Sequence, residues 1–250
     1  MIPQAPELVF AGGLVFARIG AILMLMPGFG EPSIPMRIRL SFALLVCVVI
    51  GPLIAPRLPA LPDQPLMLAG LVMGEVVTGL MIGAVARIFM SAAAVAGQVI
   101  GMQSGLAMAQ SFDPSQGQQG ALVATFLNLT FLLLLFATNT HHLLLAMMVN
   151  SYDVFDPGQM PSMADGAQWA LNAFIDAFNI GVQLAAPLIV FGLVFYLALG
   201  VLSRLMPQAQ IFFIAMPSNI IVGLFILAIS LGAMSAVWLE RMQRFATDMN

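Results

Sequence analysis

The chain has little charge and almost no cysteine, and each scarcity excludes a class of protein. Only 8% of its residues are charged, whereas about a quarter are charged in a soluble domain. The net charge is only −3 and there is no basic tail, so binding to nucleic acid is not expected. Lysine is absent, and the one cysteine, Cys47, excludes a disulfide or a cysteine metal site within the chain.

Long uncharged apolar stretches take the place of the missing charge. Hydrophobic residues make up 61% of the chain. No charged residue occurs in the intervals 88–112, 114–152, 177–203 and 205–239. Each interval is longer than the roughly 20 apolar residues that cross a hydrocarbon core. The sequence therefore predicts an all-α, hydrophobic, multi-helix membrane-type protein that forms a single domain over residues 1–250.

Proline and glycine divide the chain into six predicted helices. These cover residues 8–26, 40–54, 66–108, 122–150, 167–202 and 211–241. The opening residues include Pro3, Pro6 and Glu7 instead of a basic region, so the first apolar segment is expected to remain as a helix and not to be a cleaved signal.

The segment 66–108 is too long for one ordinary bilayer span. As a straight helix it would measure ~64 Å, about twice the hydrocarbon thickness. It must either fold back near Arg87 or extend well beyond the bilayer. The arginines also give no clean topology by the positive-inside rule. Both features are expected of helices that pack against protein partners.

Small residues on the same segment favour close helix packing. Gly79 and Gly83 are four residues apart, and a run of Ala and Gly follows them from residue 92 to residue 101. Such faces let backbones approach closely in a membrane. Packing within the chain and packing against another subunit are both compatible with this pattern.

Three charges interrupt apolar helices and need partners. Arg18 and Glu75 each lie inside one such helix, and Asp176 interrupts another. Charges in these segments are usually paired or functional. An Arg–carboxylate pair that ties two helices together is favoured over a proton relay. There is no HExxH or GxSxG motif, so no catalytic, metal or cofactor residue is expected.

Residues 105–120 separate two apolar helices with a stretch rich in Gly and Gln. Its first half is apolar and its second half is polar. Irregular backbone of this kind needs water or protein around it, not lipid. A plain solvent loop and a loop across a pore mouth are both possible from the residues alone.

These motifs, in this order and spacing, resemble the FliR family of flagellar export-gate proteins and their virulence-type type III secretion counterparts. The resemblance runs over nearly the whole chain. Its motifs are Arg18, Pro27-Gly-Phe-Gly30, Pro35-x-Arg37, Glu75-x3-Gly79-x3-Gly83, Ala96-Gly97, Gly105-Leu-Ala-Met-Ala109, Asp113-Pro114, His141-His142, Ala186-Pro187, Leu199-Gly200, Arg204-x2-Pro207-Gln208, Ile211-Phe212, Pro217 and Gly223.

The resemblance implies a non-enzymatic subunit of the bacterial inner membrane and flagellar basal body, in a helical export-gate complex that passes unfolded substrate polypeptides. The implied partners are FliP-like, FliQ-like and FlhB-like proteins. A secondary transporter for a small solute is the alternative, but no internal repeat supports it. Flagellar and virulence-type systems both stay open.

The resemblance also implies a pore plug. The family's plug loop corresponds to Gly105, Leu106, Met108, Ser111, Phe112, Asp113, Pro114, Gln116, Gly117 and Gly120. We further expect Arg18 and Glu75 to be structural charges. We expect Arg204 and Pro207 to mark a turn between the last two helices, because Pro removes a helical donor and disfavours helix just before it.

Overall fold

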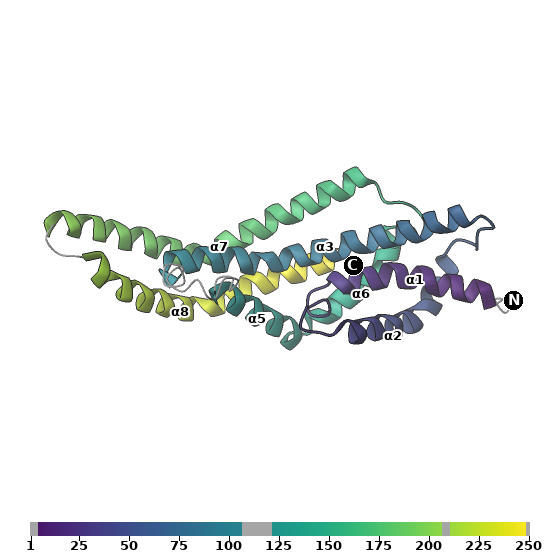
Figure 1. Ribbon diagram of the computed structural model, residues 1–250, viewed down its shortest axis with the longest axis horizontal. Coiled ribbons are helices and arrows are strands. Elements are labelled where there is room, and N and C mark those ends of the chain that lie inside the picture. The colour runs from purple at the N-terminus through teal and green to yellow at the C-terminus, as the bar shows by residue number, and fades with distance from the viewer. Residues whose placement is uncertain (1–4, 107–121, 207–210, 249–250) are drawn as a thin grey trace. The chain divides into compact units, whose positions relative to one another are not determined.

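The computed structural model describes residues 5–106, 122–206 and 211–248, which form helices and their connections (Figure 1). The helices are α1 (Ala5–Leu25), α2 (Met36–Ile54), the short 3-10 helix η1 (Ala55–Arg57), α3 (Pro65–Gln103), α5 (Leu122–Ala137), α6 (Thr140–Val154), α7 (Met163–Leu205) and α8 (Ile211–Asp248). No strand occurs in these ranges. The prediction of an all-α protein with long apolar helices is confirmed.

Most of these helices are long and apolar enough to span a bilayer. In the described ranges this holds for five of them, and the bent pair α5–α6 would make a sixth. Several outer faces are apolar and exposed. On α2, for example, Val48 is 75% exposed, and on α7, Val190 is 64% exposed. Such faces suit contact with lipid or with other proteins better than contact with water.

Helix α3 is continuous through its midpoint. It has 39 residues, so it is ~58 Å long at 1.5 Å rise per residue. The alternative in which the chain folds back near Arg87 is therefore wrong. No proline interrupts the segment, and Arg87 instead points to the chain's own Glu31, with 3.8 Å between Nη1 and Oε1.

The predicted single helix over residues 122–150 is also wrong. The chain forms α5 and α6, which are bent by 77° across a short break. At the break Asn139 adopts a left-handed conformation with φ of 58°, and the Thr138 and Thr140 hydroxyls lie 2.8 Å apart. Asn tolerates this conformation better than most residues, because its short polar side chain can bond locally.

The described chain forms two compact units. One consists of residues 1–89, 135–175 and 242–250, and the other of residues 90–134 and 176–241. The three longest helices, α3, α7 and α8, each contribute residues to both units. The expectation of one domain over the whole chain stays a prediction.

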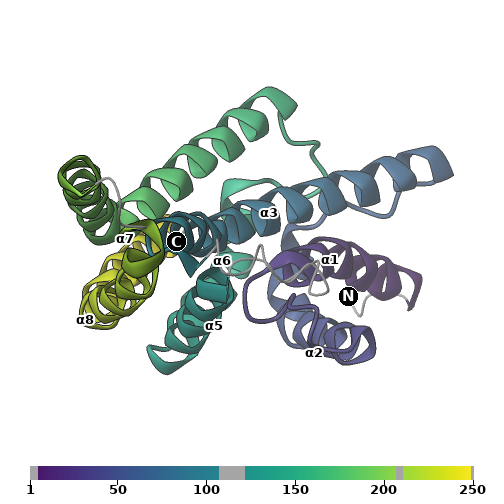
Figure 2. The ribbon, with the colours of Figure 1, turned by 60° about the vertical axis from the view of Figure 1, so that its left-hand side comes forward.

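Each unit has its own apolar core. In the first unit α1 and α2 lie side by side (Figure 2), and Phe29 stacks on Phe42 with 5.2 Å between ring centroids. In the second unit Trp238 of α8 stacks on Phe131 of α5 with 4.7 Å between ring centroids, and both rings are buried. Phe29 and Phe42 are half-buried, and aromatic contacts of this kind help to hold each unit together.

Candidate functional site

Glycines bring α1 and α3 into backbone contact in the first unit. Glu75, Gly79 and Gly83 recur every four residues and therefore lie on one face of α3. A Cβ atom at Gly79 would lie 2.5 Å from the Arg18 carbonyl oxygen, and one at Gly83 would lie 2.9 Å from Leu25 Cβ. No larger residue fits without moving a helix. The two glycines thus serve packing within the chain.

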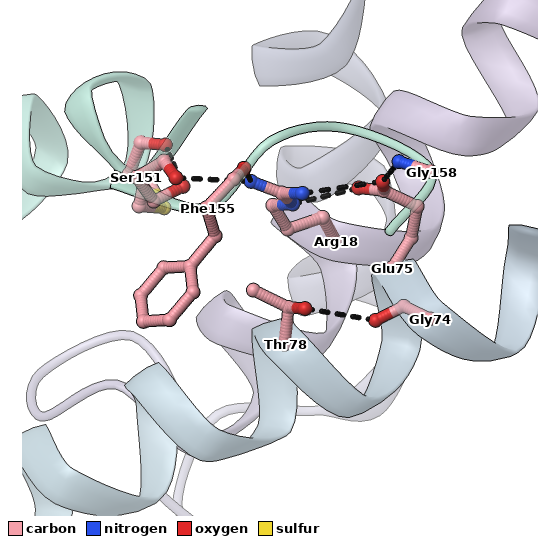
Figure 3. A network of polar contacts seen from close by, with 8 residues as sticks. Arg18, Gly74, Glu75, Thr78, Ser151, Phe155 and Gly158 are labelled. Atoms are coloured by element: carbon pink, nitrogen blue, oxygen red, sulfur yellow. Dashed lines mark hydrogen bonds and ion pairs between the residues drawn. The ribbon is translucent and has the colours of Figure 1, made fainter. Parts of the chain in front are cut away.

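A buried ion pair lies at this helix crossing. Arg18 of α1 and Glu75 of α3 are both 0% exposed. The Arg18 Nε donates to Glu75 Oε2 at 2.6 Å, and Nη2 donates to Oε1 at 3.2 Å (Figure 3). This two-point contact uses the planar fork of the guanidinium, which gives it both strength and a fixed geometry.

The remaining guanidinium nitrogen binds the carboxyl end of α6. Arg18 Nη1 donates to the Ser151 carbonyl oxygen at 3.0 Å and to the Phe155 carbonyl oxygen at 2.9 Å. The Ser151 carbonyl oxygen also accepts a hydrogen bond from the Phe155 N–H at 3.0 Å. Carbonyls at the carboxyl end of a helix carry partial negative charge, which attracts the guanidinium. The Arg18 Cζ also lies 4.1 Å from the centroid of the Tyr152 ring, within range of a cation–π contact. A single side chain therefore joins α1, α3 and α6.

Glu75 in turn holds the loop that follows α6. Its Oε1 accepts a hydrogen bond from the Gly158 N–H at 2.7 Å (Figure 3). Gly158 has φ of +78°, and a Cβ there would lie 2.9 Å from Pro59 Cγ. Only glycine combines this conformation with this space. The site also contains Thr78, whose hydroxyl donates to the Gly74 carbonyl oxygen of its own helix at 2.9 Å.

The Arg18–Glu75 site connects helices through an ion pair and hydrogen bonds. Arg18 makes four hydrogen bonds and the Glu75 carboxylate accepts three. Every group is held by the protein itself, and no group of three metal-ligating side chains occurs in the part of the chain that the structure describes. The sequence pattern predicted an Arg–carboxylate pair between two helices and left the carboxylate open, and the structure shows that Glu75 is the partner of Arg18. The sequence pattern missed Ser151, Phe155 and Gly158, for which the only signal was the turn at Pro157-Gly158.

Only the start of the predicted plug loop is described. Gly105 follows the end of α3 with φ of +73°, the left-handed conformation that often ends helices. Leu106, in the loop, and Leu122, the first residue of α5, line an apolar groove of about 930 Å³ with other residues of α5 and α8. The other predicted plug residues lie outside the described residues. They are Met108, Ser111, Phe112, Asp113, Pro114, Gln116, Gly117 and Gly120.

The other residues singled out in the sequence lie apart from the ion pair. Arg204 is exposed in the last turn of α7, and no partner for its guanidinium is found among the described residues. Pro207 lies outside the described residues, so its role in the turn before α8 stays a prediction. Asp176 is exposed on α7. His141 and His142 lie at the start of α6 with 4.1 Å between their ring centroids and 50° between their ring planes.

Comparison with known proteins identifies the family. Residues 9–245 match the family described as bacterial export proteins, family 1. The flagellar biosynthetic protein FliR of Caulobacter vibrioides is 46% identical over 93% of each chain. The chain belongs to the FliR family of bacterial export proteins.

Two further relatives are a flagellar protein and a translocation protein. FliR of Escherichia coli K12 is 30% identical over 84% of this chain and 80% of its own length. The Yop proteins translocation protein T of Yersinia pestis is 30% identical over 64% of each chain. By name, the Caulobacter and Escherichia relatives are flagellar biosynthetic proteins and the Yersinia relative is a translocation protein. Nothing in the comparisons favours a solute transporter.

Proposed function

We propose that the protein is a non-enzymatic subunit of the gate of a flagellar export apparatus and passes unfolded export polypeptides across the bacterial inner membrane. The observation that carries the proposal is the family match over residues 9–245. A flagellar system is favoured over a virulence-type one, because the Caulobacter flagellar relative matches 93% of the chain and the Yersinia relative 64%.

The proposed partners are FliP-like, FliQ-like and FlhB-like proteins of the basal body. The exposed apolar side chains of α2 and α7 support this part of the proposal, because a 250-residue chain leaves them uncovered. The length of α3, ~58 Å, is also easier to accommodate in a protein assembly than in a bilayer about 30 Å thick. In this proposal the α-helices of the chain form part of a helical complex.

The proposed gate is the segment 105–120, which plugs the closed pore. Its support from the described residues is the apolar groove whose lining includes Leu106, near the start of the segment, and Leu122, two residues beyond its end. A groove of this character suits the apolar first half of the loop, with Met108 and Phe112. A closed-to-open ratio of 99 to 1 needs only roughly 2.7 kcal/mol, which two buried apolar side chains supply. Such a gate is tight at rest and can still be opened by an incoming chain.

Deletion of residues 111–119 tests the proposal. The complex should still assemble, because the deletion touches none of the helices α1–α3 or α5–α8. The membrane should become leaky to ions and small solutes. Conductance measures the leak, and co-purification with mass spectrometry measures assembly and identifies the partners.

A matched control replaces the same nine positions with Gly and Ser and so keeps the length of the loop. It separates the loss of apolar contacts, centred on Phe112, from the loss of chain length. An assembled deletion variant as tight as the parent would contradict the plug assignment. Co-purification without FliP-like or FliQ-like proteins would contradict the proposed complex.

A further inference from the structure

The carboxyl end of α3 is held from two sides within the second unit. Helix α7 presents Gly192 and Tyr196 to it, and α8 presents Asn219 and Gly223. Each pair is four residues apart and therefore lies on one face of its helix. The residues held are 103–105, where the chain leaves α3.

Asn219 makes the polar contacts of this cluster. Its side chain is only 4% exposed. The Nδ2 donates to the Gln103 carbonyl oxygen at 3.2 Å and contacts the Tyr196 hydroxyl at 3.4 Å. Gln103 is the last residue of α3, so its carbonyl has no partner within the helix. Asn219 thus caps α3 from a neighbouring helix.

Close packing reinforces the cap. A Cβ atom at Gly223 would lie 2.7 Å from Ser104 Cβ, and one at Gly105 would lie 3.2 Å from Asn219 Nδ2. Ser104 is 1% exposed. The contact between Gly223 and Ser104, one turn of α8 beyond Asn219, therefore requires a small residue on each side. The packing fixes where α8 meets residues 103–105, and the amide fixes their orientation.

The polar part of the cluster is weak. Both hydrogen bonds are longer than the usual 2.9–3.0 Å, and the buried Asn219 Oδ1 has no hydrogen-bond partner among the residues that the structure describes. Asn219, Tyr196 and Gly105 also line a small cavity, so the site is not tightly filled. A cap with these properties holds the end of α3 but is easily released.

We propose that Asn219 is a positioning residue of the gate: through Gln103 and Tyr196 it holds the point at which the chain leaves α3, and so keeps the gate closed at rest. This inference rests on the proposed function, in which the segment after Gly105 is the plug. Asn219 acts on the gate through the end of α3 and need not touch the exported chain.

The test measures leak per assembled complex in cells that carry the full export apparatus. Asn219→Ala removes the amide, and Asn219→Asp keeps its shape but removes the N–H donor. We expect both variants to assemble in normal amount and to leak about three to ten times more than the parent, the range that corresponds to the loss of one modest hydrogen bond. Tyr196→Phe, which removes one hydroxyl, should leak about twofold more.

Ser230→Ala is the matched control, because Ser230 lies on the same helix and the hydrogen bonds of its hydroxyl to described residues stay within α8. It should leave the leak unchanged.

Asn219→Ala should also add nothing to the leak of the 111–119 deletion, since both changes act on the same gate. A purely structural role for Asn219 would lower the amount of complex and would not show this loss of additivity.

Two results separate the failure of this inference from the failure of the proposed function. If the deletion leaks but the assembled Asn219 and Tyr196 variants stay as tight as the parent, the positioning role is wrong and the plug stands. If Asn219→Ala prevents assembly, the leak of the Tyr196→Phe complex alone decides whether the positioning role is right, because this variant loses only a hydroxyl. If the deletion itself is tight, the proposed function is wrong, and this inference is wrong with it.

Discussion

Two buried polar clusters hold helix ends in this protein, and they differ in strength. In the first unit, Arg18 and Glu75 are fully buried, and the shortest contact between them is 2.6 Å. In the second unit, Asn219 makes two hydrogen bonds of 3.2 and 3.4 Å, and its Oδ1 has no partner among the described residues. The first cluster is charged and contains four hydrogen bonds from one side chain, whereas the second is neutral and contains two longer ones.

The difference suggests different tasks. Removing one partner of a buried ion pair leaves an uncompensated charge and costs about 3–5 kcal/mol. Removing one ordinary hydrogen bond costs about 0.5–1.5 kcal/mol. The Arg18 cluster therefore suits a permanent anchor, a contact that holds α1, α3 and α6 together in every state of the protein. The Asn219 cluster suits a contact that is made and released.

The largest effect is expected at the anchor. Glu75→Gln keeps the shape of the side chain but leaves the Arg18 charge unpaired, so we expect a loss of about 3–5 kcal/mol of stability. The thermal unfolding midpoint of the purified complex and the amount of complex in cells measure this loss.

Asp153→Asn is the matched control for that change. It is also an acid-to-amide substitution, but the Arg57–Asp153 pair is exposed, with side chains 47% and 60% accessible. Exposed pairs contribute about 0–1 kcal/mol. Equal losses in the two variants would contradict the anchor role of Glu75.

A smaller effect is expected where α1 and α3 touch. Gly79→Ala would place a Cβ atom 2.5 Å from the Arg18 carbonyl oxygen, so the helices must separate. We expect a loss of about 1–3 kcal/mol, as for other overpacked positions. Thermal unfolding of the complex measures it.

Gly70→Ala, on the same helix, provides the control because nothing lies within 4 Å of its added Cβ. There we expect a gain of up to about 1 kcal/mol from helix propensity. A Gly79→Ala variant as stable as Gly70→Ala would contradict the close backbone contact of α1 and α3 at Gly79.

The sequence predicts an Arg–carboxylate pair, because a charge in an apolar helix is usually paired, and the structure shows that Glu75 is the partner of Arg18. The other partners of this pair are main-chain atoms of Ser151, Phe155 and Gly158. A backbone carbonyl or N–H has no sequence signature, so only the helix end and the Pro157-Gly158 turn could be anticipated.

Helix continuity was harder to predict than helix existence. Arg87 suggested a possible break in α3, but an exposed charge does not end a helix when a partner such as Glu31 is near. The predicted helix 122–150 runs through Asn139, although this residue adopts a left-handed conformation between α5 and α6. A single Asn in an apolar run does not distinguish a polar helix position from a turn. Asn219 shows the same ambiguity, because its main partner is a carbonyl at a helix end.

The most direct test compares Glu75→Gln and Asn219→Ala side by side, with the leak expressed per assembled complex. Glu75→Gln should lower the amount of complex severalfold while the remaining complex stays tight. Asn219→Ala should leave the amount of complex unchanged while each complex leaks about three to ten times more. The reverse pattern, with a leaky Glu75→Gln complex and a scarce but tight Asn219→Ala complex, would contradict the division of roles between the two clusters.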